Sequence, residues 1–94
     1  MGAIVVRVLN SDDKTLGKRT IQVRGMFKFQ LIAAAKVLQV ISAYREVYGS
    51  HARKAVVQLR DIDMESSDTF VSFVKKYSPI PVEFVVLAEV QHIA

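Results

Sequence analysis

The sequence contains no cysteine and no tryptophan, and it has only two prolines and four glycines among its 94 residues. Without cysteine, the chain has no disulfides, no thiolate zinc site and no thiol nucleophile. It also lacks a long uninterrupted hydrophobic run. The most apolar stretch, residues 26–48, is interrupted by charged and amide side chains: Lys28, Gln30, Lys36, Gln39, Arg45 and Glu46. A membrane-spanning helix needs about 20 predominantly apolar residues. We therefore expect no membrane span and, with no signal peptide at the N-terminus, a cytoplasmic protein.

Acidic residues are scarce in the first part of the chain. Residues 1–60 hold eleven of the thirteen Lys and Arg against three acids, a net charge of +8, whereas residues 61–94 hold two Lys against six acids, a net charge of −4. Four of these six acids lie within residues 61–68, where they suit the start of a helix, because negative charge complements the N-terminal end of the helix dipole. The basic surplus has no such local explanation. It predicts a polyanionic partner, because an exposed basic surface attracts polyanions.

Hydrophobic periodicity predicts a single domain over residues 1–94. Alternation predicts strands at 3–9, 18–24, 55–60 and 81–90; the first two form a hairpin whose loop begins with turn residues 10–13 and is closed by Gly17. Helices are expected at 26–48 and 66–77, the first ended by Gly49. Right-handed crossovers between parallel neighbours that advance in one direction place both helices on one sheet face. The order strand-strand-helix-strand-helix-strand thus predicts an α+β two-layer sandwich, a four-stranded mixed sheet with two helices on one face.

The other face of this sheet is expected to stay uncovered. By alternation it displays long polar side chains among aliphatic ones: Arg7, Gln22, Arg24, Gln58, Arg60, Val5, Val85 and Leu87. The helix at 26–48 is apolar over most of its circumference, so we expect it to contact its own sheet and also either the second helix or another subunit. Together with a hydrophobic fraction of 51%, this predicts a homo-oligomer, most simply a dimer.

The segment from Lys54 to Val90 resembles part of the Alba family of small archaeal chromatin and RNA-binding proteins. The resemblance rests on a short apolar strand at 55–59, a helix at 66–77 that begins acidic and ends basic, and a long strand at 81–90, all preceded by the helix at 26–48. It implies a small basic dimer, with two helices on a four-stranded sheet, that binds nucleic acid without a cofactor. The family's basic pair followed by Pro before the first helix is absent here, so no functional residue is carried over.

Basic side chains of the predicted hairpin, the first-helix entry and the third-strand entry are the candidate nucleic-acid-binding residues: Lys14, Lys18, Arg19, Arg24, Lys28, Arg53 and Lys54. Lys and Arg contact phosphates without reading base sequence. We therefore predict a non-enzymatic protein that binds DNA or RNA electrostatically and with little sequence preference. The alternative is an oligomeric assembly or adaptor subunit without a nucleic-acid role, in which the charge split serves subunit recognition. Ordinary solvated charge, which keeps a small hydrophobic protein soluble, explains the same residues equally well.

Other motifs in the sequence predict no chemistry. Asp61-x-Asp63-x-Glu65 offers oxygen ligands for a hard cation, but it lacks the glycine and the later bidentate glutamate of an EF-hand loop, and helix capping is the favoured interpretation. Ser50-His51 pairs a nucleophile with a base, but no third orienting acid is evident. No Gly-rich phosphate loop is present. We thus expect no catalytic residue, metal site, cofactor or small-molecule substrate.

Overall fold

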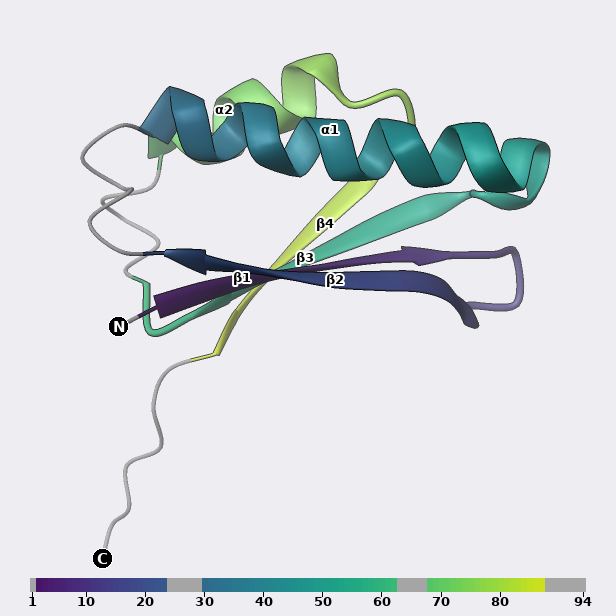
Figure 1. The fold of residues 1–94 in the computed structure, drawn as a ribbon, viewed down its shortest axis with the longest axis horizontal. Coiled ribbons are helices and arrows are strands. Elements are labelled where there is room, and N and C mark those ends of the chain that lie inside the picture. The colour runs from purple at the N-terminus through teal and green to yellow at the C-terminus, as the bar shows by residue number, and fades with distance from the viewer. Residues whose placement is uncertain (1, 24–29, 63–67, 88–94) are drawn as a thin grey trace, which may run out of the picture.

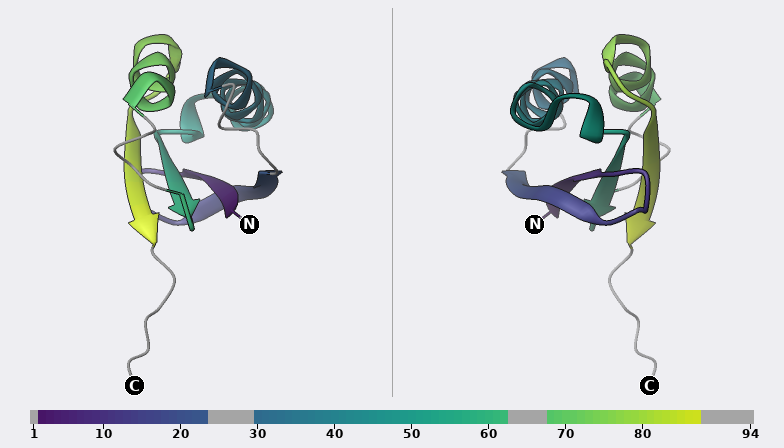
Figure 2. Two further views of the ribbon diagram at one scale, coloured as in Figure 1. Left: turned by 90° about the vertical axis from the view of Figure 1, so that its left-hand side faces the viewer. Right: turned by 90° about the vertical axis from the view of Figure 1, so that its right-hand side faces the viewer.

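The computed structural model describes residues 2–23, 30–62 and 68–87. Its elements follow in the order β1 (Gly2–Leu9), β2 (Thr15–Val23), α1 (Gln30–Tyr48), η2 (Gly49–His51), β3 (Lys54–Arg60), α2 (Asp68–Tyr77) and β4 (Val82–Leu87). Both helices cover the same face of a four-stranded sheet (Figure 1), and Figure 2 shows the two layers end-on. The predicted α+β two-layer sandwich is confirmed. The expected helix start at 26–29 and the expected strand end at 88–90 lie outside the described residues.

The sheet is mixed and has the strand order β2-β1-β3-β4. β1 is antiparallel to both β2 and β3, whereas β3 is parallel to β4. The helix α2 therefore joins parallel neighbours, as predicted. The helix α1 does not: it joins β2 to β3 across β1, so the expectation of a crossover between neighbours is wrong for α1. β1 lies between β2 and β3, and Val5, on the side away from the helices, is only 3% exposed.

The core lies between the sheet and the two helices. Alternate residues of β1 and β3, among them Ile4, Val6 and Leu59, are fully buried beneath Val37 of α1 and Phe70 of α2. Burying an aliphatic or aromatic side chain of this size contributes about 1.5–3 kcal/mol. The helix α1 contacts β1, β2 and α2, which confirms that it packs against both the sheet and the second helix.

The hairpin turn is built by Asn10. Its Oδ1 accepts hydrogen bonds from the backbone N–H groups of Asp12 at 2.8 Å and Lys14 at 3.0 Å. Asp13 takes the left-handed conformation at φ +61°, which aspartate tolerates better than most residues. The predicted turn chemistry at residues 10–13 is consistent with this geometry.

Gly17 does not close the loop, contrary to expectation. It lies within β2 opposite Val8, and a Cβ placed on it would be 2.6 Å from Cε1 of Tyr44. The glycine thus lets the Tyr44 ring of α1 lie directly on the strand, where the Tyr44 hydroxyl donates to the Lys18 carbonyl at 3.1 Å. Gly17 therefore serves a helix–strand contact, a role that local turn rules do not reveal.

The end of α1 follows the sequence-based expectation, whereas the start of α2 is held by a contact that was not predicted. Gly49, at φ +58°, follows the last residue of α1 as expected for a C-terminal cap. At the start of α2, the Gln30 side chain of α1 accepts the Phe70 N–H at 2.8 Å. Asp68 lies in the first turn of α2, whereas Asp63 and Glu65 lie outside the described residues. None of the helices in the described ranges is long and apolar enough to cross a membrane.

Candidate nucleic-acid interface

The strand register arranges the uncovered sheet face in rows that cross all four strands. Read from β2 to β4, the rows are Lys18–Arg7–Val56–Glu83, Thr20–Val5–Gln58–Val85 and Gln22–Ala3–Arg60–Leu87. Residues directly opposite each other on paired strands share a sheet face. The predicted mixture of Arg, Gln and aliphatic residues on this face is therefore confirmed, apart from Arg24, which lies outside the described residues, and Leu87, whose side chain the structure does not describe.

The first row places two cations side by side on the β1–β2 half of this face. Arg7, half-buried, lies directly opposite Lys18, which is exposed. Like charges directly opposite each other destabilise a strand pair, on the same scale of about 0.2–1 kcal/mol as other cross-strand interactions. Neither side chain forms an ion pair with any acid in residues 2–23, 30–62 or 68–87. Arg60 adds a third cation four residues further along β3 than Val56, about 13 Å away at ~3.3 Å per residue.

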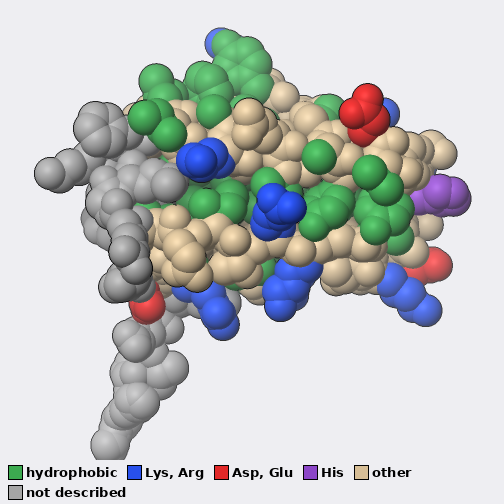
Figure 3. Space-filling view, in the orientation of Figure 1, with side chains coloured by type: hydrophobic (Ala, Val, Ile, Leu, Met, Phe, Trp, Pro, Cys, Tyr) green, Lys and Arg blue, Asp and Glu red, His purple; other side chains and the backbone are tan. Residues whose placement is uncertain are grey.

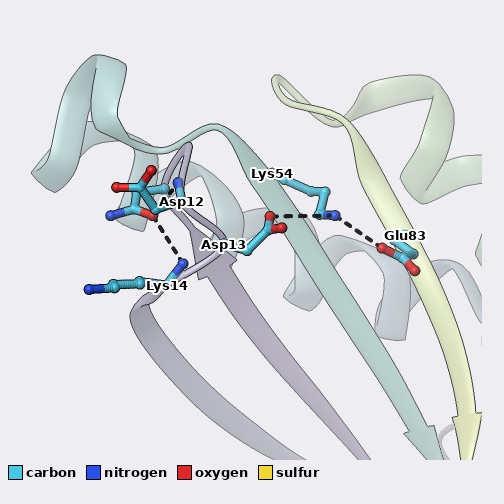
Figure 4. Close-up of polar contacts among 6 residues, drawn as sticks. Asp12, Asp13, Lys14, Lys54 and Glu83 are labelled. Atoms are coloured by element: carbon cyan, nitrogen blue, oxygen red, sulfur yellow. Dashed lines mark hydrogen bonds and ion pairs between the residues drawn. The ribbon is translucent and has the colours of Figure 1, made fainter.

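The hairpin end of the sheet carries a different charge arrangement. Lys54 Nζ lies 3.2 Å from Glu83 Oε1 of β4 and 3.9 Å from Asp13 Oδ1 of the turn (Figure 4). The turn and the β3 entry are held together, because the Arg53 N–H donates to the Leu9 carbonyl at 2.9 Å. Three bases gather at this end, and three acids accompany them: Lys14, Arg53 and Lys54 with Asp12, Asp13 and Glu83. The hairpin end is thus formally neutral.

Of the seven residues predicted from the sequence, the five that the structure describes do not form one site. Lys14, Arg53 and Lys54 lie together at the neutral hairpin end, while Lys18 lies on the uncovered face beside Arg7. Arg19 is exposed but belongs to the opposite side of β2, since it pairs with Val6. Arg24 and Lys28 lie outside the described residues. The structure therefore groups Lys18 with Arg7 and Arg60, which strand alternation placed on the uncovered face but which are not among the seven candidates.

The sequence contains only part of the signal for this grouping. Alternation places Arg7 on the uncovered face. The partner of Arg7 depends on the register, which shifts between Val8 and Leu9, where Leu9 pairs with Thr15 while Val8 pairs with Gly17. An irregularity of this kind displaces the pairing by one residue, and a shift by one residue moves a side chain to the other face. The opposition of Arg7 and Lys18 is therefore a structural finding.

The described residues contain no group of three or more His, Cys, Asp or Glu arranged to hold a metal ion. Ser50 and His51 are both exposed in η2. Comparison with known proteins found no matching family model, no matching curated protein and no matching solved structure.

Proposed function

We propose that the protein binds the phosphate backbone of DNA or RNA through its uncovered sheet face, without catalysis and with little sequence preference. The observation that carries this proposal is the direct opposition of Arg7 and Lys18 on that face. In the free protein the two charges repel each other. A phosphate between them turns this repulsion into two charge-assisted hydrogen bonds, which are stronger than neutral ones.

The neighbouring groups suit the same ligand. Gln58 lies in the adjacent row, and Gln22 and Arg60 both lie in the row after it on the same face. Amide and guanidinium groups are common partners of phosphate and sugar oxygens. The part of this face that the structure describes carries no aromatic side chain on which a base could stack, so binding without base readout is the mode favoured. The resemblance to the Alba family stays a prediction.

The test is the salt dependence of binding, measured by fluorescence anisotropy. Labelled duplex DNA, single-stranded DNA and single-stranded RNA of about 20 nucleotides exceed the ~4–16 nucleotides that small domains cover. The logarithm of the association constant falls with the logarithm of salt concentration by about 0.9 per phosphate contact on duplex DNA and about 0.7 on single strands. The triple variant Arg7→Gln, Lys18→Gln, Arg60→Gln should lower this slope by about 2–3.

A matched control removes three charges from the helix layer instead. Arg45, Lys75 and Lys76 are exposed on α1 and α2, and replacing all three by Gln changes the net charge equally. This control should leave the slope unchanged. Absence of binding at low salt, or an equal loss of slope in both triple variants, would contradict the proposal. The relative affinities of the three oligonucleotides decide between DNA and RNA.

An assembly or adaptor role is the second candidate, favoured by apolar side chains on the opposite layer. Four large hydrophobic side chains are exposed on the helices: Leu31 at 51%, Ile32 at 53%, Val47 at 73% and Tyr77 at 56%. Figure 3 shows hydrophobic side chains exposed among Lys and Arg on the α1 side of the molecule. This role requires a complex that persists without nucleic acid, and light scattering across ionic strength measures it.

A further inference from the structure

The outward side of α1 carries an evenly spaced series of exposed residues. Five positions recur at alternating intervals of four and three residues, and we name them the outer stripe: Ile32, Lys36, Gln39, Ala43 and Glu46. This alternation keeps one side of a helix facing a partner helix along its length. The opposite side of α1, including Ala33, Val37 and Ile41, is buried against the core.

A shallow hollow adjoins the outer stripe. Gln39, Ala43 and Glu46 line a hollow of about 490 Å³ between α1 and α2, together with Phe73 of α2 and the small side chains of Ala35 and Ser42. Small residues let two helix backbones approach closely. Because Phe73 is only half-buried in the single chain, a helix placed here also covers aromatic surface.

The charges of the outer stripe are complementary to a second copy of the same stripe. Lys36 and Glu46 are ten residues apart, about 15 Å along the helix at ~1.5 Å per residue. In an antiparallel pair with its two-fold axis at the level of Ile41, Lys36 of each copy faces Glu46 of the other, and Gln39 faces Ala43. A parallel pair would oppose Lys36 to itself and Glu46 to itself. The charge pattern therefore selects the antiparallel arrangement.

The same register brings together the exposed apolar residues at the two ends of α1. Within one chain, Ile32 and Val47 are 15 residues apart, about 22 Å along the helix, and they are 53% and 73% exposed. In the antiparallel pair, Ile32 of one copy lies within about 4.5 Å of Val47 of the other along the helix axis. We infer that the outer stripe of α1 is a self-association surface, on which two copies of this chain pair antiparallel about a two-fold axis.

This surface is independent of the proposed nucleic-acid interface, because α1 lies on the opposite side of the sheet (Figure 1). A single helix pair belongs to the small, transient class of interfaces, below about 1,200 Å². The measurement is therefore sedimentation equilibrium of the full chain, freed of nucleic acid, over concentrations up to several hundred micromolar. The wild-type chain should dimerise, and the dimer should weaken as salt rises.

Charge exchange tests the register. Lys36→Glu and Glu46→Lys each oppose like charges, and each should weaken the dimer at least about tenfold. The double exchange Lys36→Glu, Glu46→Lys should restore it. Arg45→Glu is the matched control, since Arg45 is exposed on α1 outside the outer stripe, and it should change the dimer little. A wild-type monomer at every concentration overturns the inference, as does a double exchange that fails to restore dimerisation when circular dichroism shows a folded chain.

Disulfide cross-linking gives a second readout, because the sequence has no native cysteine. A mixture of Gln39→Cys and Ala43→Cys chains should form a cross-linked heterodimer on mild oxidation, since these positions face each other in the proposed pair. Chains carrying Arg45→Cys should cross-link far less. Equal cross-linking by all three variants indicates random collision and overturns the proposed register.

Discussion

The two halves of the uncovered sheet face differ in how their cations are compensated. On the β1–β2 half, Arg7 and Lys18 lie opposite each other and form no ion pair within the described residues. On the β3–β4 half, Lys54 is held by Glu83 at 3.2 Å and Asp13 at 3.9 Å. One basic group is thus neutralised by an acid from the far end of the chain. The fold, rather than the count of charges along the sequence, decides where positive potential remains.

This difference concerns electrostatic potential more than stability. The side chains of Lys54, Asp13 and Glu83 are 36%, 75% and 56% exposed, and ion pairs at this level of exposure contribute about 0–1 kcal/mol. Their main effect is to cancel the attraction of Lys54 for an anion on the β3–β4 half. We therefore expect a polyanion to prefer the β1–β2 half.

The largest expected effect comes from disrupting the β1–β2 half itself. Gly17→Ala places a Cβ 2.6 Å from the Tyr44 ring, so the ring must move and its hydrogen bond to the Lys18 carbonyl is strained. Overpacking of this kind costs about 1–3 kcal/mol. Urea unfolding should show a loss of stability of that size, and nucleic-acid affinity should fall as well, because Lys18 follows Gly17 on the same strand.

A double-mutant cycle supplies the control for this prediction. In a Tyr44→Ala background there is no ring for the new Cβ to contact. The further change Gly17→Ala should therefore lower the free energy of unfolding much less than it does in the wild type. Equal costs in both backgrounds would show that the strand itself, and not the contact with α1, requires glycine at this position.

Most of the fold could be predicted from the sequence, because the apolar residues alternate clearly in the strands and recur with helical periodicity in the helices. The uncovered face was identified by the same alternation, from Arg7 on β1 to Gln58 on β3. The place of β1 between β2 and β3 could not be predicted, because strand order depends on which strands pair in the assembled sheet. The contact of Gly17 with Tyr44 was likewise hidden, since it joins positions 27 residues apart.

The candidate site was only partly predictable. The sequence marks basic residues near turns and strand entries, and it thereby includes Lys14, Arg53 and Lys54. It does not show that Glu83 lies beside Lys54, because the two residues are joined only by the pairing of β3 with β4. Nor does it show that Arg7 opposes Lys18. Both facts depend on register, which arises from packing across the whole sheet.

A smaller effect is expected when the two halves are made alike. Glu83→Gln together with Asp13→Asn removes both carboxylates that neutralise Lys54, and asparagine keeps the left-handed backbone at position 13 accessible. Affinity for nucleic acid should rise by about three- to tenfold at low salt, because one more cation becomes available to phosphate. Anisotropy titrations measure the change. The matched control, Glu46→Gln with Asp68→Asn on the helix layer, should raise affinity less; an equal rise would indicate a general effect of net charge.

The smallest expected effect is on stability: removing one cation should change the free energy of unfolding in opposite directions on the two halves of the uncovered face. Arg7→Gln removes a repulsion across the β1–β2 pair, so at low salt it should raise the free energy of unfolding by about 0.5 kcal/mol relative to its value at high salt. Lys54→Gln removes an attraction, so its salt-dependent contribution should have the opposite sign. Comparing the free energy of unfolding at low and at high salt separates this electrostatic effect from the packing that is lost when the arginine stem is shortened, because packing does not depend on salt. Adding Lys18→Gln to Arg7→Gln should give little further gain, because one substitution already abolishes the pair. Chemical denaturation by urea, which adds no ionic strength, measures the free energy of unfolding of the wild type, both single variants and the double variant. Salt-dependent changes of equal sign at positions 7 and 54 would mean that both halves respond only to net charge. The contrast between the two halves would then be wrong.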